Sequence, residues 1–384
     1  MFESLLDEEL SVLQRKDLLR SLKPLTLTSS IRANWENKDL VLFCGNDYLG
    51  LSRHPDVIAA AKSAAEEAGI GSGAARLISG TSDYHEKIEK ELADFRKKEK
   101  ALIFSAGYLA NLGAISGLAG ERDLILMDKL CHASLIDGIK LSGAELRVFP
   151  HKNYGKCDEI LKKNNGHRKR FIVSDTVFSM DGDIAELQEL VGLKKKHDAF
   201  LIVDDAHGMG VLGKEGSGAL EEDGLEKEVD LITGTLSKSL GCLGGFVSGS
   251  ETVINYLINH ARPFIFATAL PPLVCAAALE GLRIIRSQPE LRKKLWSNIH
   301  YFKSVLSEKG IKLPAITSAI FSIIIGEEKE ALKVSQQLAE MGYLVPAVRY
   351  PAVSKGKARL RVTVSACHDE RQIEGFAAAL SSIL

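Results

Sequence analysis

The 384-residue chain has almost no net charge, no long hydrophobic run and no N-terminal leader pattern, and each absence excludes a class of protein. A formal charge of −1 gives no overall basic field for nucleic acid or an anionic membrane. No apolar run approaches the roughly 18 residues that a membrane-spanning helix requires. The first nine residues are acidic and lack the basic and apolar regions of a signal peptide.

Closely spaced cysteines are also missing. The six cysteines are scattered, and no Cys-x-x-Cys occurs. This spacing fits neither a disulfide scaffold nor a zinc site, and it suits a reducing compartment. We therefore expect a cytoplasmic protein. Cys131 and Cys242 lie beside residues singled out below, and we interpret them as bystanders.

Apolar runs alternate with helical patterns through the middle of the chain. The composition, 45% hydrophobic and 26% charged, is that of an ordinary globular protein long enough for two domains. Strands alternating with helices predict a mostly parallel sheet covered on both faces, with ligands outside the carboxyl ends of its strands. The predicted strands are 101–104, 123–127, 145–149, 171–174, 200–204 and 229–233, and the clearest helices are 107–119, 133–142 and 185–197.

The two ends of the chain lack the regular alternation of the middle part. We predict an N-terminal segment over 1–45, a large α/β domain over 46–280 and a small α/β domain over 281–384. The expected elements of the ends are helices at 3–22, 54–67, 84–97, 280–308, 327–341 and from 369, and strands at 38–43, 319–325, 343–349 and 358–364.

Lys238 is the strongest chemical signal. It lies between small hydroxyl residues in 234–241 (Gly-Thr-Leu-Ser-Lys-Ser-Leu-Gly), and Asp204 ends a neighbouring predicted strand. Such a pair is what pyridoxal phosphate (PLP) chemistry requires, because the amine forms a Schiff base with the cofactor and the acid keeps the pyridine nitrogen protonated. An opposite charge about 4 Å away is worth about 4 kcal/mol at an effective dielectric constant of about 20, which raises a pyridinium pKa by about 3.

Residues beside this pair suit the same cofactor. His207, three positions after Asp204, is placed to reach a phenolic oxygen, and the hydroxyls of Thr235 and Ser237 suit a phosphate. A metal site formed by Asp204, Asp205 and His207 is an alternative, although no further ligand motif accompanies it.

Two earlier segments add to the predicted site. The turn 105–108 (Ser-Ala-Gly-Tyr) follows a strand and begins a helix, so its backbone N–H groups can bind a phosphate. His132 is interpreted as a side chain that stacks on the cofactor ring, and a histidine that merely begins a helix is the alternative. The glycine pattern 208–213 follows a strand, but a glycine-rich segment comes after it where a dinucleotide fingerprint needs a helix.

Several segments together resemble the α-oxoamine synthases, a family of fold-type-I PLP enzymes, over nearly the whole chain. This resemblance implies a large, mostly parallel-sheet domain with a smaller C-terminal α/β domain, and a homodimer with shared active sites. The matching segments are 46–51 (Asn-Asp-Tyr-Leu-Gly-Leu), 79–81 with His85 and Glu89, 177–183 (Val-Phe-Ser-Met-Asp-Gly-Asp), 204–208 (Asp-Asp-Ala-His-Gly), 267–272 (Ala-Thr-Ala-Leu-Pro-Pro) and 358–363 (Ala-Arg-Leu-Arg-Val-Thr).

The resemblance also implies roles for individual residues. Lys238 is the Schiff-base lysine and proton shuttle, Asp204 pairs with the pyridine nitrogen, His207 pairs with the phenolic oxygen, and His132 stacks on the ring. The remaining cofactor contacts are Gly107, Tyr108, Thr235, Ser179 near the polar edge, and Thr268 acting from the partner subunit. Arg361 and Asn46 bind the amino-acid carboxylate, Arg361 being favoured over Arg359 on the same strand face, and Arg20 helps to bind the acyl substrate.

The family's reaction is a decarboxylative condensation of an amino acid with an acyl thioester. The chain length and the stretches 183–185 and 318–320 favour the member that joins L-alanine to a pimeloyl thioester, carried by coenzyme A or acyl carrier protein, in biotin biosynthesis. The chain departs from relatives at Ala74-Ala75 and from that member at Tyr350-Pro351. Relatives that use glycine or serine, an aminotransferase and a catalytically silent partner chain are the alternatives.

Overall fold

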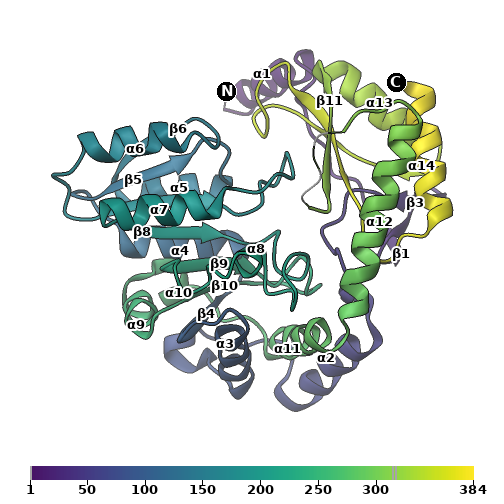
Figure 1. Ribbon diagram of the computed structural model, residues 1–384. Coiled ribbons are helices and arrows are strands. Elements are labelled where there is room, and N and C mark those ends of the chain that lie inside the picture. The colour runs from purple at the N-terminus through teal and green to yellow at the C-terminus, as the bar shows by residue number, and fades with distance from the viewer. Residues whose placement is uncertain (1, 314, 316–317) are drawn as a thin grey trace. The chain divides into compact units, whose positions relative to one another are not determined.

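The chain divides into two compact units. A computed structural model describes residues 2–313, 315 and 318–384. The larger unit comprises Leu49–Ser179 and Asp183–Arg292, and the smaller comprises Met1–Tyr48, Met180–Gly182 and Lys293–Leu384. The labels of Figure 1 are used throughout.

A seven-stranded sheet forms the centre of the larger unit. Its order is β4-β10-β9-β8-β7-β5-β6, and only β10 runs antiparallel to its neighbours. The predicted fold class, with its mostly parallel sheet, is therefore confirmed. The strands are β4 (Lys100–Phe104), β5 (Leu124–Asp128), β6 (Glu145–Phe149), β7 (Arg170–Asp175), β8 (Phe200–Asp204), β9 (Leu231–Thr235) and β10 (Gly245–Gly249), of which β10 was not predicted.

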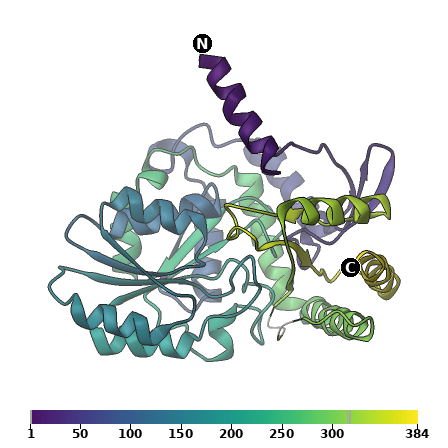
Figure 2. The same ribbon diagram turned by 90° about the horizontal axis from the view of Figure 1, so that it is seen from above.

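Helices lie on both faces of this sheet, as Figure 2 shows. The helices of the larger unit are α2 (Pro55–Ala68), α3 (Asp83–Phe95), α4 (Gly107–Leu118), α5 (Ala133–Ser142), α6 (Tyr154–Lys163), α7 (Leu187–His197), α8 (Ala219–Glu222), α9 (Glu251–His260), α10 (Arg262–Ile265) and α11 (Pro272–Ser287). Short turns η1 (Leu51–Arg53) and η2 (Arg76–Gly80) complete the unit.

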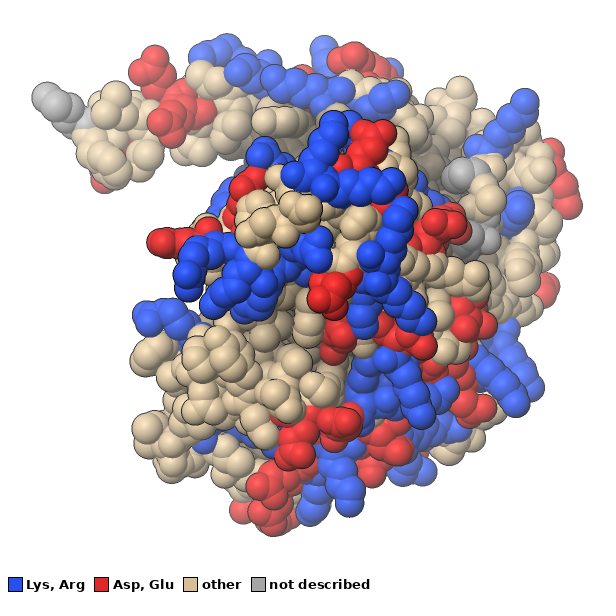
Figure 3. Space-filling view, turned by 60° about the vertical axis from the view of Figure 1, so that its left-hand side comes forward, with Lys and Arg blue, Asp and Glu red and all other residues tan. Residues whose placement is uncertain are grey.

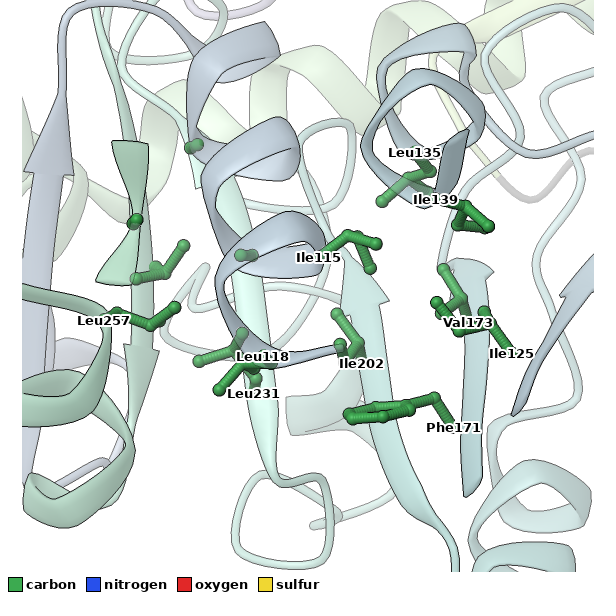
Figure 4. Packing of buried hydrophobic residues seen from close by; sticks show 14 of the residues in the cluster. Ile115, Leu118, Ile125, Leu135, Ile139, Phe171, Val173, Ile202, Leu231 and Leu257 are labelled. Carbon is green, nitrogen blue, oxygen red and sulfur yellow. The ribbon is translucent and has the colours of Figure 1, made fainter. Parts of the chain in front are cut away.

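The core of the larger unit lies between α4 and the sheet (Figure 4). Ile115 and Leu118 of α4 approach Ile202 of β8 and Leu231 of β9, and all four are at most 8% exposed. Helix α4 is apolar on most sides, so it is buried between the sheet and its helical neighbours. Burial of each such side chain contributes roughly 1.5–3 kcal/mol to the stability of the fold. This packing holds in place the strands whose ends are described below.

A buried ion pair joins α3 to the end of β8. Arg96 Nη2 donates to Asp205 Oδ2 at 2.6 Å, and both side chains are 1% exposed. Thr176 Oγ1 and the backbone N–H of Ala219 also donate to this carboxylate. These hydrogen bonds offset part of the cost of burying the carboxylate, although burial still raises the pKa of Asp205. The pair thereby holds the loop that begins one residue after Asp204.

Replacing Arg96 with alanine is expected to lower the free energy of unfolding by about 3–5 kcal/mol, because Asp205 would remain buried without its partner. Urea denaturation followed by circular dichroism measures this loss. The exposed pair Lys156–Glu159 provides the control, since Lys156→Ala should cost less than about 1 kcal/mol. Equal losses for the two variants would show that the buried pair is not a principal support.

The smaller unit contains two sheets. The first has the order β1-β2-β3-β12 and pairs β3 with β12 in parallel; the second has the order β11-β14-β13. Its strands are β1 (Thr26–Ser29), β2 (Arg32–Trp35), β3 (Lys38–Leu42), β11 (Ile320–Gly326), β12 (Tyr343–Leu344), β13 (Ala347–Val348) and β14 (Ala358–Thr363). Its helices are α1 (Phe2–Arg15), α12 (Pro289–Glu308, from Lys293 onward), α13 (Glu328–Glu340) and α14 (Glu370–Ile383).

Two predicted helices differ from the observed ones. The helix expected over 3–22 ends at Arg15, and Asp17 follows with φ 55°. The helix expected over 280–308 is interrupted at Gln288, because Pro289 disfavours a helical conformation in the residue before it.

The surface carries both signs of charge. On the face shown in Figure 3, basic and acidic side chains lie beside one another, in keeping with the net charge of −1. Among the described residues, no helix has the length and apolar character needed to cross a membrane.

Candidate active site

A cavity of about 240 Å³ opens at the carboxyl ends of the strands in the larger unit. Asp175 of β7 pairs with Asp204 of β8, and Asp204 pairs with Thr233 of β9, so these strand ends are aligned. Residues predicted for the site line this cavity, namely Gly107, Tyr108, His132, Ser179, Asp204, His207, Thr235, Ser237 and Lys238. The structure thus brings together residues spread over more than 130 positions of the sequence.

Asp204 is held in one orientation by two donors. Its Oδ1 accepts from the backbone N–H of Ala206 at 2.9 Å, and its Oδ2 accepts from Asn111 Nδ2 at 2.6 Å. The side chain is 8% exposed and lines the cavity. A carboxylate fixed in this way can place its charge against a cationic ligand without reorganisation.

A second carboxyl group, Asp175, lies beside Asp204. It is 3% exposed, and its Oδ1 accepts from the backbone N–H of His132 at 3.3 Å. Burial, followed by the charge of Asp204, raises the pKa of Asp175 well above its usual range.

Lys238 lies in a tight loop between β9 and β10. The backbone N–H of Gly241 donates to the Lys238 carbonyl at 2.8 Å. Gly241 has φ +67°, and an added Cβ would lie 2.2 Å from the backbone nitrogen of Ser52, so this turn requires glycine. Thr235 Oγ1 closes the loop base by donating to the Gly244 carbonyl at 2.9 Å. The loop holds Lys238 at the cavity through its backbone.

The N-terminus of α4 forms another wall. Gly107 and Tyr108 begin this helix and line the cavity. An added Cβ at Gly107 would lie 3.2 Å from the side chain of Thr235, so the helix end and the β9 loop are in close contact. The Tyr108 hydroxyl donates to Asp137, and its ring meets the His132 ring edge-on at 6.2 Å. A helix N-terminus beside a threonine hydroxyl suits an anionic group.

Two histidines complete the lining. His132 precedes α5, and its Nδ1 accepts from the backbone N–H of Ser134 at 3.3 Å. Burial lowers the pKa of His132, although Asp204 acts in the opposite direction. His207 is 8% exposed. Both imidazoles line the cavity, so they would lie beside a ring-shaped ligand bound there.

The loop that carries Ser179 is anchored by His151. His151 Nδ1 lies 3.0 Å from Asp128 Oδ1, and its Nε2 lies 2.9 Å from Asp183 Oδ2. The Phe178 ring meets the His151 ring edge-on at 4.4 Å. Burial opposes the imidazolium charge, but the hydrogen bonds to the two carboxylates outweigh it and raise the pKa of His151 to about 9.

This raised pKa predicts a pH-dependent contribution to stability. Because the folded-state value of about 9 exceeds the ordinary 6.5, the contribution is complete below about pH 6.5 and is lost as the pH rises through about 9. The difference in unfolding free energy between the native protein and His151→Gln should therefore shrink between about pH 6.5 and 9.5. Denaturant midpoints across this range measure it, and a difference that grows with pH would contradict the assignment.

The smaller unit holds all three residues predicted to bind the substrate, and two of them, Arg361 and Asn46, are in contact. Arg361 Nη2 donates to Asn46 Oδ1 at 3.2 Å, and the Tyr48 hydroxyl donates to the same oxygen at 3.3 Å. Arg359 instead pairs with Asp181, and its side chain is 8% exposed. The guanidinium of Arg359 is therefore committed to that pair, which supports the choice of Arg361.

Arg20 and Thr268 lie in other surroundings. Arg20 Nη2 donates to the Tyr350 carbonyl at 2.8 Å, within the smaller unit. Arg349, which the sequence did not single out, binds the backbone carbonyls of Asp17 and Leu19 close by. Thr268 is not part of the 240 Å³ cavity, and its carbonyl accepts from Ser105 Oγ at 2.8 Å. Its role in a partner's site stays a prediction.

A family model for aminotransferase class I and II matches residues 38–380. The chain belongs to this family. Among curated proteins, this chain is 46% identical over 380 residues to a putative 8-amino-7-oxononanoate synthase of Desulforudis audaxviator. The match covers 99% of this chain and 98% of that protein. The chain is 40% identical to 8-amino-7-oxononanoate synthase 1 of Bacillus velezensis, covering 96% and 94%. The resemblance to fold-type-I PLP enzymes is thereby confirmed.

Two solved structures match this chain over most of its length. A serine palmitoyltransferase from S. paucimobilis with a bound PLP–myriocin aldimine matches this chain with a TM-score of 0.92 at 34% identity. The match covers all of this chain and 97% of the other. An 8-amino-7-oxononanoate synthase from Francisella tularensis matches with a TM-score of 0.77 at 32% identity, covering 89% and 97%.

The residues around the cavity fit PLP chemically. The cofactor needs an amine for its aldehyde, an acid for its pyridine nitrogen and donors for its phosphate. Lys238, Asp204 and the backbone N–H groups at the start of α4 line one cavity and supply each of these. Sequence reasoning missed Asn111 and Asp175; a buried asparagine within the otherwise apolar α4 was the available signal for the first.

Proposed function

We propose that this chain is a PLP-dependent 8-amino-7-oxononanoate synthase. It would condense L-alanine with a pimeloyl thioester and release carbon dioxide and a free thiol, as a step of biotin biosynthesis. The observation that carries the proposal is the cavity lined by both Lys238 and Asp204. The curated relatives at 40–46% identity support the choice of reaction.

When bound, PLP supplies a ring that accepts the electrons of the amino acid's Cα. Asp204, which Asn111 and Ala206 hold in one orientation, would keep a proton at the ring nitrogen. Lys238 would hold the cofactor at its aldehyde carbon, and its amine would serve as the base for the Cα proton of the amino acid. His207 and Ser179 would hold the phenolic oxygen, and His132 would stack on the ring.

The other residues bind and orient. Gly107, Tyr108 and Thr235 would hold the phosphate through the α4 terminus and a hydroxyl, and Thr268 would add to the site of a partner subunit. Arg361, oriented by Asn46, forms two parallel hydrogen bonds with the amino-acid carboxylate. Arg20, with Arg349 nearby, would bind the acyl substrate.

We further propose a cytoplasmic homodimer with shared sites. The larger unit exposes large apolar side chains that a partner subunit would cover, notably Ile70 at 84%, Ile78 at 81% and Phe266 at 68%. All six cysteines are free, which suits a reducing compartment. The thioester carrier would be coenzyme A or acyl carrier protein.

A panel of substrates tests the function. L-alanine, glycine and L-serine are each combined with pimeloyl, acetyl and palmitoyl thioesters of coenzyme A, and with pimeloyl-acyl carrier protein, while thiol release is followed. The highest kcat/KM is expected for alanine with a pimeloyl thioester. A preference for serine and palmitoyl-CoA would favour the reaction named for the serine palmitoyltransferases, and keto-acid formation without thiol release would indicate transamination.

A further inference from the structure

Asn111 is the centre of a buried hydrogen-bond network at the cavity. Its Oδ1 accepts from Thr233 Oγ1 at 2.6 Å, while its Nδ2 donates to Asp204 Oδ2 at 2.6 Å and to Ser134 Oγ at 2.8 Å. These four side chains are at most 8% exposed. Because a carboxylate only accepts hydrogen bonds, the amide nitrogen of Asn111 must face Asp204. The donors and acceptors of the whole network are therefore ordered.

Ser134 carries this order to His132. Ser134 Oγ already accepts an N–H from Asn111, so its own hydrogen can be donated to His132 Nδ1, 2.7 Å away. The backbone N–H of Ser134 approaches the same nitrogen at 3.3 Å. Two donors that converge on one ring nitrogen require that nitrogen to carry a lone pair.

We propose that Asn111 and Ser134 hold His132 in the neutral tautomer with its proton on Nε2. Because Nδ1 accepts hydrogen bonds, the other ring nitrogen, Nε2, carries the proton and is a donor. His132 lines the cavity, where a ligand can accept from this N–H. A donor of this kind binds a carboxylate or carbonyl oxygen of the substrate and does not remove a proton. Asn111 and Ser134 are positioning residues, and one amide group orders both Asp204 and His132. Only the identity of the bound oxygen rests on the function proposed above.

The tautomer is measured directly by two-bond ¹H–¹⁵N correlation spectra of the histidine rings in the ¹⁵N-labelled full chain. Spectra are recorded at about pH 7.5 with and without PLP, and His132→Gln assigns the signal. A pyridine-like Nδ1 and a pyrrole-like Nε2 are expected in both states. A protonated Nδ1, alone or together with Nε2, would overturn the proposal. Because the spectrum without PLP needs no turnover, failure of the proposed reaction would leave this result unchanged.

Variants test the role of the two positioning residues. Ser134→Ala removes one of the two donors to Nδ1, so both ring ¹⁵N shifts should move toward their mean, and Ser134→Thr should restore them. Ser335→Ala, which removes a buried hydroxyl that donates to the Val345 carbonyl, is the matched control and should leave His132 unchanged. Asn111→Ala should give the same spectral change and weaken PLP binding by about tenfold or more, because a charge-assisted hydrogen bond to Asp204 is lost. An unchanged His132 spectrum in folded Ser134→Ala and Asn111→Ala would refute the assignment.

Discussion

Lys238→Ala is expected to lower turnover by at least about 10³-fold and to abolish the visible absorbance of lysine-bound PLP. The substitution removes both the covalent attachment and the group that moves the Cα proton, and a positioned acid–base group alone contributes about 10²–10⁴-fold. The loop backbone should keep its shape, since Gly241 and Thr235 hold it by contacts that do not involve the lysine side chain. Thiol release and absorbance spectra of the purified variant measure both effects.

The exposed Lys214 provides the comparison for this variant. Lys214→Ala should retain turnover and the absorbance band. A folded Lys238→Ala protein with either property intact would remove Lys238 from the role proposed for it, and with it the central support for a PLP reaction in this cavity.

Asp204→Asn is expected to lower kcat by about 10³-fold. The loss has the size of a charge interaction worth about 4 kcal/mol at about 4 Å and an effective dielectric constant of about 20. An asparagine also offers one oxygen where the aspartate accepts from both Ala206 and Asn111, so one buried donor loses its partner. Single-turnover and steady-state rates, measured at saturating PLP, separate slower chemistry from weaker cofactor binding.

Asp204→Glu is the matched variant because it keeps the charge and changes only its position. It should retain more activity than Asp204→Asn at every pH examined. If the neutral variant were the faster of the two, the charge of Asp204 would not be what activates the ring.

Much of the larger unit was predictable because its strands and helices alternate with clear apolar patterns. The predicted strand 145–149 and helix 133–142 coincide with β6 and α5. Strand β10 was not visible, since 245–249 (Gly-Phe-Val-Ser-Gly) is short and begins and ends with glycine, which strands disfavour. Its antiparallel direction follows from the loop that carries Lys238, which turns the chain back beside β9.

Sequence reasoning anticipated those residues of the cavity that follow strand ends, and it missed residues defined by contacts between distant elements. Lys238 and Asp204 each lie at or just after an apolar run, so their placement at one sheet edge could be anticipated. Asn111 binds Thr233 across 122 positions of the sequence, and His151 binds Asp183 across 32. No local pattern encodes such pairs, because they arise only when the strands are assembled.

The parallel pairing of β3 with β12 has a consequence for synthesis on the ribosome. Leu40 and Leu42 of β3 are buried in a cluster with Leu344 of β12. Leu344 therefore leaves the ribosome about three hundred residues after the two leucines that it covers. The larger unit can acquire its own core meanwhile, because domains generally fold as separate units. During that interval Leu40 and Leu42 lack the strand that covers them in the folded protein, and apolar side chains exposed in this way make a nascent chain prone to aggregation.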